Sequence, residues 1–286
     1  MVRGLSLQWY PGHMTKARRE LAARMPSQDV IVEVLDARMP AASANPVITE
    51  LRGATRCLKI LTRSDLADPA VTSAWLRHLE AAPGATVRAF AATATQPGET
   101  RRRFADALKA FGLASTSGKP VRALIAGVPN IGKSTLINTL MDRAVAKVSD
   151  KPAVTKIQKT VALPTGTLLT DSPGLLWPEI VDEDAALRLA FGGVIPATAI
   201  DYVIVGRFAA ELLRQRYPAL VMARFKLAEL GPTGDAVLAE LGRRRGCLLP
   251  GGAIDLHKAA ELLVHEFRHG LIGRISLEAP PASAPA

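Results

Sequence analysis

The sequence has few cysteines and no long hydrophobic run. Only Cys57 and Cys247 occur among its 286 residues. Two thiols are too few for a disulfide framework or for a zinc site with four thiolate ligands. The most apolar stretch, from Ile195 to Leu213, is interrupted by Asp201 and Arg207, and no run approaches the roughly 18 to 20 residues that cross a bilayer. We therefore expect a soluble protein without a membrane span.

Targeting signals are also missing from the first residues, MVRGLSLQWYPGHM. They contain neither the apolar region and cleavage site of a secretory signal nor an Arg/Ser-rich amphipathic presequence. We therefore expect a cytoplasmic protein. Hydrophobic residues make up 48% of the chain and charged residues 22%, which excludes wholesale disorder.

Acidic residues are outnumbered, with 26 Asp and Glu against 36 Lys and Arg. The formal net charge is +10 and the isoelectric point is about 10.0. A globular chain with such an excess often binds a polyanion, most commonly nucleic acid. The chain is also rich in Ala and Arg, as proteins from GC-rich genomes are, so charge alone leaves both explanations open.

Short apolar runs alternate with helical segments over the first 180 residues. Strands are expected at 30–36, 56–61, 86–92, 121–127 and 166–171, and helices at 14–25, 70–79, 101–111 and 133–140. Buried strands that alternate with helices indicate a parallel sheet with both faces covered. The sequence thus predicts an α/β domain over residues 1–180.

The pattern changes to helical periodicity alone after about residue 180. In the clearest helix, Asp255 stands at the N-cap position and Gly270 just beyond the C-terminal end. We expect a small all-α domain over residues 181–278. The Pro/Ala/Ser-rich residues 279–286 are expected to form a disordered tail.

Residues 127–135, GVPNIGKST, match the phosphate-binding pattern G-x-x-x-x-G-K-[ST]. An apolar strand precedes the motif and a helical segment follows it, so backbone N–H groups and a helix N-terminus can surround phosphates. Lys133 is expected to reach the β and γ phosphates and to aid catalysis, and Ser134 to offer its hydroxyl to Mg²⁺. The expected nucleotide-binding residues of the loop are Asn130, Ile131, Gly132, Lys133, Ser134 and Thr135.

Further along the chain, the strand LLTD ends in the D-x-x-G motif DSPG. Asp171 can hold Mg²⁺ through water, and the N–H of Gly174 can face the γ phosphate. Between the two motifs, Thr155 is the natural switch residue whose hydroxyl meets Mg²⁺. These residues complete a site for a nucleoside triphosphate.

Two loops that could recognise a base precede the phosphate loop. The first, Thr62-Arg63-Ser64-Asp65, follows a strand, and the Asp65 carboxylate could accept the N1 and N2 hydrogens of guanine. The second is the small-residue segment ATATQPG (92–98), whose N–H groups could contact the guanine O6. In ordinary small GTPases the phosphate loop comes first and the guanine loops last. The same sheet can form when the chain termini are joined and reopened elsewhere.

With its motifs in this order, the sequence closely resembles the YlqF/RbgA family of circularly permuted GTPases. The resemblance is carried by WYPGHM (9–14), DARMP (36–40), GVPNIGKST, DSPG and FRHGLIGRISLE (267–278), and covers all but the last eight residues. It implies a P-loop GTPase three-layer fold with permuted motif order. It also implies that the small all-α domain that follows binds RNA and the ribosome. It also implies a monomer that uses GTP, GDP and Mg²⁺, binds rRNA of the immature 50S subunit with GTP, promotes a late assembly step and leaves after hydrolysis.

The resemblance also implies two catalytic features. Leu175 follows D-x-x-G, where Ras-like enzymes have the Gln that orients water, and the family's proposed replacement is His13. In GxxNxGKS GTPases the residue that corresponds to Asn130 helps to bind K⁺, which offsets transition-state charge. The resemblance therefore implies K⁺-dependent hydrolysis that ribosomal particles stimulate.

This chain departs from the family at the base-reading motif N-K-x-D, which here is TRSD. Asp65 is retained, Thr62 still offers a hydroxyl, and Arg63 could lie over the base as Lys would, so guanine preference with weaker affinity is expected. Ala153 replaces the usual Gly before the switch Thr. A nucleotide-binding RNA scaffold with little hydrolysis is the alternative. An unrelated P-loop ATPase is disfavoured by Asp65 and by the motif order.

Overall fold

The structure is a computed structural model that describes residues 12–81, 86–113, 119–141, 160–176, 182–195 and 201–281, with backbone only for residues 12–14. The chain divides into two compact units. Residues 1–181 and 278–286 form the first, and residues 182–277 form the second. Of the predicted C-terminal tail, residues 282–286 lie outside the described part of the chain.

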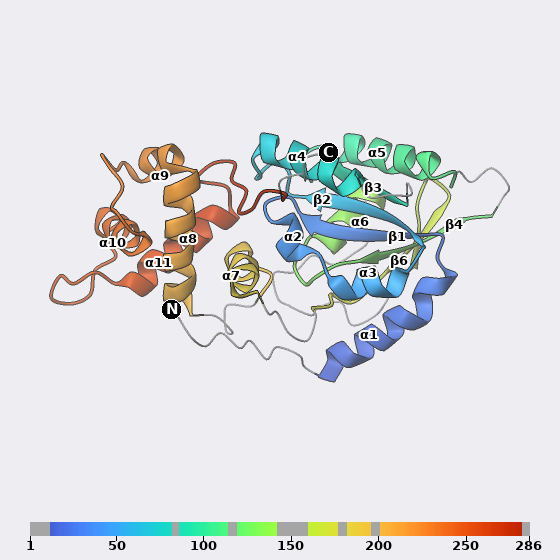
Figure 1. The fold of residues 1–286 in the computed structure, drawn as a ribbon, viewed down its shortest axis with the longest axis horizontal. Coiled ribbons are helices and arrows are strands. Elements are labelled where there is room, and N and C mark those ends of the chain that lie inside the picture. The colour runs from blue at the N-terminus through green and yellow to red at the C-terminus, as the bar shows by residue number, and fades with distance from the viewer. Residues whose placement is uncertain are drawn as a thin grey trace. The chain divides into compact units, whose positions relative to one another are not determined.

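A six-stranded sheet forms the centre of the first unit, with the order β3-β2-β1-β4-β6-β5 (Figure 1). Its strands are β1 (Val30–Asp36), β2 (Arg56–Thr62), β3 (Val87–Ala91), β4 (Val121–Ala126), β5 (Thr160–Ala162) and β6 (Thr167–Asp171). Neighbouring strands are parallel except that β5 runs antiparallel to β6. Strand β4, which leads into the phosphate loop, pairs with β1 and not with β3, the strand before it in sequence. The two halves of the sheet, β1–β3 and β4–β6, therefore meet at the β1–β4 pair.

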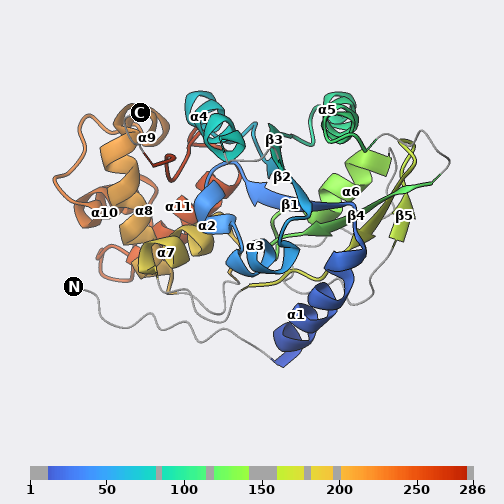
Figure 2. The same ribbon diagram turned by 45° about the vertical axis from the view of Figure 1, so that its right-hand side comes forward.

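Helices cover both faces of this sheet. They are α1 (Gly12–Arg24), α2 (Pro40–Ser43), α3 (Pro46–Arg52), α4 (Pro69–Glu80), α5 (Pro97–Ala110) and α6 (Lys133–Met141), with a 3₁₀ turn at Met25–Ser27. Figure 2 shows α1 and α3 on one side of the sheet and α5 and α6 on the other. All seven residues of β1 are buried, as expected for a central strand between two helical layers. The three-layer α/β fold with permuted motif order is thus confirmed.

The second unit is helical throughout its described residues. It contains α7 (Glu183–Gly192), α8 (Tyr202–Arg216), α9 (Pro218–Phe225), α10 (Gly234–Arg244) and α11 (Leu256–Arg268). The expected caps of α11 are present, because the Asp255 side chain accepts from the N–H of Lys258 and Gly270 adopts a φ of 69° just past the helix. No helix among the described residues of either unit has the length and hydropathy of a membrane span.

Differences from the sequence-based expectations concern short elements and helix starts. The predicted strands agree with the structure to within one residue at each end, but β5, α2 and α3 were not predicted. Helix α5 begins at Pro97, earlier than the predicted residue 101, because the fixed φ of proline suits the first turn of a helix. Pro97 and Gly98 of the second predicted base loop therefore belong to this helix.

Replacing Gly206 with Ala tests the close approach of α8 to α11. A Cβ at Gly206 would lie 2.5 Å from the Cβ of Ala260, so the two helices must separate. We expect Gly206→Ala to lower the free energy of unfolding by about 1–3 kcal/mol, measured by denaturant titration. The matched control is Gly98→Ala in α5, whose Cβ would meet nothing within 4 Å. Equal stability of the two variants would contradict the packing described.

Candidate functional site

The residues expected to bind a nucleotide lie at one edge of the sheet. Because β1, β2, β3, β4 and β6 are parallel, the loops that follow them emerge on the same side. In open α/β sheets this edge, outside the carboxyl ends of the strands, is where ligands bind. The loops here begin at Asp36, Thr62, Ala92, Gly127 and Asp171.

The phosphate loop is held in an unusual backbone conformation. Gly127, Asn130 and Gly132 have positive φ values of 156°, 54° and 102°. A Cβ at Gly127 would lie 2.8 Å from the carbonyl oxygen of Val34 on β1, so only glycine fits there. Lys133 is the first residue of α6, which places the loop at a helix N-terminus, where backbone N–H groups attract phosphate.

Lys133 is buried, with 8% of its surface exposed. Its Nζ donates hydrogen bonds to the carbonyl oxygens of Gly127 at 3.0 Å and Val128 at 2.8 Å. Burial lowers the pKa of Lys133 to about 8, although the negative charge of Asp171 partly opposes the shift. A buried ammonium next to the loop is the group that would meet phosphate oxygens.

Asp171 supplies a carboxylate that fits a divalent cation. Burial raises the pKa of Asp171, and the nearby Lys133 charge opposes that rise. Within the described residues, its buried Oδ1 and the Oγ of Ser172 have no hydrogen-bond partner. Those residues also contain no group of three or more His, Cys, Asp or Glu that could hold a metal. One carboxylate oxygen, the half-buried Ser134 hydroxyl and phosphate oxygens match the way Mg²⁺ is usually held.

The D-x-x-G segment packs directly on the phosphate loop. A Cβ at Gly174 would lie 2.8 Å from the Cα of Pro129 and 3.2 Å from the Nζ of Lys133. The N–H of Leu175 donates to the carbonyl of Gly127 at 3.3 Å. The structure therefore brings Gly174 next to Pro129 and Lys133 of the phosphate loop.

The two predicted base loops also meet. Both the N–H and the hydroxyl of Ser64 donate to the carbonyl of Ala92, at 3.2 and 3.1 Å. The Thr62 Oγ1 lies 2.8 Å from the carbonyl oxygen of Ile131, which attaches the first base loop to the phosphate loop. Asp65 is exposed and its carboxylate makes no hydrogen bond with the part of the chain described.

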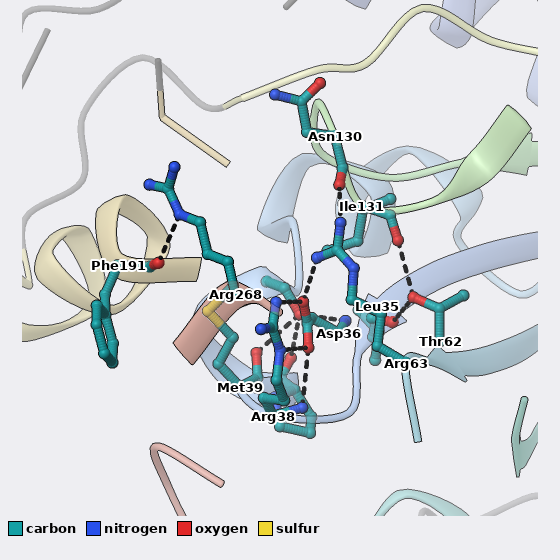
Figure 3. A network of polar contacts seen from close by, with 12 residues as sticks. Leu35, Asp36, Arg38, Met39, Thr62, Arg63, Asn130, Ile131, Phe191 and Arg268 are labelled. Carbon is teal, nitrogen blue, oxygen red and sulfur yellow. Dashed lines mark hydrogen bonds and ion pairs between the residues drawn. The ribbon is translucent and has the colours of Figure 1, made fainter. Parts of the chain in front are cut away.

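A buried carboxylate joins the first base loop to the phosphate loop. The Oδ2 of Asp36 accepts from the Nη2 of Arg38 at 2.8 Å and from the Nη1 of Arg63 at 2.6 Å (Figure 3). Arg63, at a positive φ of 57°, also donates from Nη2 to the carbonyl of Asn130 at 2.6 Å. The guanidinium expected to lie over the base is thus held between Asp36 and the phosphate loop.

Sequence reasoning did not assign a role to Asp36 or Arg38. The available signal was an acidic residue at the end of the apolar run VIVEVLD, followed two positions later by a basic residue. Burial raises the pKa of Asp36, but the charges of Arg38 and Arg63 and the hydrogen bonds from Arg38 outweigh it and hold that pKa far below its ordinary value.

Other expected residues fall in different places. Thr155 and Ala153 lie outside the described residues, and His13 is in α1 with its side chain outside them. Ile131, Gly132 and Thr135 lie in the phosphate loop or the first turn of α6.

Removing the charge of Asp36 should strongly destabilise the protein. Asp36→Asn leaves two guanidinium groups without a buried counter-ion, so we expect a loss of about 3–5 kcal/mol in the free energy of unfolding near neutral pH. The control is Asp235→Asn. Asp235 pairs with Arg207 at the surface, where the two side chains are 63% and 49% exposed. Loss of this pair should lower the free energy of unfolding by less than about 1 kcal/mol.

The Asp36 contribution should also depend on pH. A carboxylate with a lowered pKa stabilises the fold above its unfolded pKa of about 4 and loses that contribution as the pH falls. The difference between the wild type and Asp36→Asn should therefore shrink below about pH 4 in denaturant titrations. A difference that stays constant down to about pH 3 would contradict the assignment.

Comparisons with known proteins agree with this geometry. A model of the family described as 50S ribosome-binding GTPase matches residues 122–221. Ribosome biogenesis GTPase A from Bacillus licheniformis is 36% identical over 282 residues, which cover 96% of this chain and 98% of that protein. GDP-bound and GNP-bound structures of YlqF from Thermotoga maritima match with TM-scores of 0.67 and 0.65 at 27% identity, over 92% and 93% of this chain and 99% of theirs. The chain belongs to the YlqF/RbgA family of ribosome biogenesis GTPases.

Proposed function

We propose that this protein binds GTP with Mg²⁺ at the phosphate loop and hydrolyses it while promoting a late step in assembly of the large ribosomal subunit. The observation that carries the nucleotide site is the buried pair of Lys133 and Asp171, with one carboxylate oxygen lacking a partner among the described residues. The relatives' names, ribosome biogenesis GTPase A, support the cellular role. The protein acts as a cytoplasmic monomer that binds the immature 50S particle with GTP and leaves after hydrolysis.

Each part of the nucleotide has a residue to receive it. Lys133 and the N–H groups from Asn130 to Thr135 bind the phosphates, because they lie at the N-terminus of α6. Ser134, Asp171 and Thr155 hold Mg²⁺, which neutralises phosphate charge when it is bound. The exposed carboxylate of Asp65 accepts the N–H groups of guanine, while Thr62 and Ser64 fix its loop.

Hydrolysis needs a group that orients water, and Leu175 cannot be that group. Its side chain is aliphatic and only 1% of its surface is exposed. We assign the role to His13, whose imidazole can exchange a proton near neutral pH. Asn130 binds K⁺, which supplies positive charge near the transferred phosphate.

The contact with rRNA involves both units. Residues 182–277 contain nearly as many acidic as basic residues, so almost all of the net charge of +10 belongs to the first unit. Its exposed basic residues include Lys16, Arg19 and Arg102. Because phosphate contacts contribute most of the affinity for nucleic acid, we place part of the rRNA contact on the first unit and the rest on the helical unit.

GTP turnover in K⁺ and in Na⁺ buffer, each with and without 50S particles, tests the enzymatic role. We expect slow basal hydrolysis that 50S particles accelerate in K⁺ only, because K⁺ and the particle complete a site that lacks a polar side chain at Leu175. A near-zero rate in all four conditions would favour a nucleotide-binding RNA scaffold with little hydrolysis.

Base recognition by Asp65 is tested with Asp65→Asn. An amide can donate to the O2 carbonyl of xanthine but cannot accept both N–H groups of guanine. We therefore expect affinity for GDP to fall by about 10²-fold, as the loss of two charge-assisted hydrogen bonds predicts, and affinity for XDP to rise. Equilibrium titration of both nucleotides measures this. The control Asp68→Asn, three residues along, changes the N-cap residue of α4 and should keep the preference for GDP.

A further inference from the structure

A second buried carboxylate of β1 supports the opposite face of the sheet. Glu33 is next to Lys59 in the β1–β2 register, and their side chains form an ion pair of 2.6 Å. The other carboxylate oxygen, Oε1, accepts from the backbone N–H of Asn45 at 3.3 Å. Asn45, which lies in the connection between α2 and α3, is thereby attached to the central strand.

Asn45 uses all its side-chain polar groups inside the protein. Only 1% of its surface is exposed. Its Oδ1 caps α3 by accepting from the N–H of Val47 at 2.9 Å, and its Nδ2 donates to the carbonyl oxygen of Leu175 at 2.7 Å. The second bond joins residues 130 positions apart and is not needed to cap a helix.

Leu175 is consequently held from both sides. Its N–H donates to the carbonyl of Gly127, at the start of the phosphate loop, and its carbonyl accepts from Asn45. The side chains of Leu175 and Leu176 are both buried. The N–H of Leu175 shares a planar peptide unit with the carbonyl of Gly174, so its bond to Gly127 fixes that unit. The bond from Asn45 fixes the next peptide unit, and the two together restrict the backbone on the C-terminal side of Gly174, which lies against Pro129.

We propose that Asn45 is a positioning residue for recognition of the γ phosphate. Through Leu175 it holds the backbone of Gly174 so that the Gly174 N–H faces the phosphate that distinguishes GTP from GDP. Asn45 itself touches no part of the nucleotide. The aliphatic side chain of Leu175 offers no polar group, so its backbone is the only part that a hydrogen bond can hold. The inference rests on the proposed GTP site and on the role expected for Gly174 from the sequence, in which its N–H faces the γ phosphate.

Substitution of Asn45 by Ser separates this role from helix capping. Ser remains a good N-cap for α3, but it lacks the amide that donates to Leu175. We expect the affinity for a non-hydrolysable GTP analogue to fall about three- to tenfold, the usual range for one buried hydrogen bond. The affinity for GDP should change by less than about twofold, because GDP lacks the γ phosphate. Basal kcat should fall with the analogue affinity.

The control variant is Asp201→Ala, which removes the N-cap of α8 in the second unit. It should lower the Tm as the loss of a helix N-cap does. It should leave the affinities for the GTP analogue and for GDP unchanged. Titrations of both nucleotides and a melting curve are made for each variant.

The outcomes distinguish the inference from the proposed site. An unchanged ratio of analogue to GDP affinity in Asn45→Ser, with both affinities intact or both reduced, overturns the positioning role and leaves Asn45 as a structural residue. Failure of the wild type to bind either nucleotide, or binding that Lys133→Ala does not weaken, instead overturns the proposed nucleotide site.

Discussion

The arrangement of the nucleotide loops depends on the buried carboxylate of Asp36. It lies at the end of β1 and binds Arg38 in its own loop and Arg63 in the loop after β2, and Arg63 reaches the Asn130 carbonyl of the phosphate loop. Three loops therefore depend on one negative charge. A buried charge is stable only when it is paired and hydrogen-bonded, so the position of each guanidinium is strongly determined.

The permuted chain order explains why β1 carries such residues. Strand β1 pairs with β2 on one side and with the phosphate-loop strand β4 on the other. The two halves of the sheet, β1–β3 and β4–β6, therefore meet at β1 and β4. Asp36 and Glu33, three positions apart, point to opposite faces of a strand with a two-residue repeat. Through Arg63 and Asn45, they connect the first half of the sheet to Asn130 and Leu175, which follow β4 and β6 of the second half.

Much of the fold could be predicted because its signals are local. The apolar runs marked β1, β2, β3, β4 and β6, and G-x-x-x-x-G-K-[ST] marked the phosphate loop. Strand β5 has three residues and α2 has four, too few to show a period. The ion pairs of Asp36 and the bond from Asn45 to Leu175 could not be predicted, because they depend on strand order and register. Asp36 lies next to Thr62 only through the β1–β2 register, which hydrophobic periodicity does not reveal.

The aliphatic residue after D-x-x-G has a structural consequence that extends beyond catalysis. A polar side chain in this position would need to reach the nucleotide or water, whereas Leu175 is part of the core together with Leu176. Its backbone groups would be left without partners in such a place, at a considerable cost in free energy, unless other residues bound them. Gly127 and Asn45 provide those partners. The segment after Gly174 is consequently a packed part of the first unit, and any group that orients water must lie outside this segment.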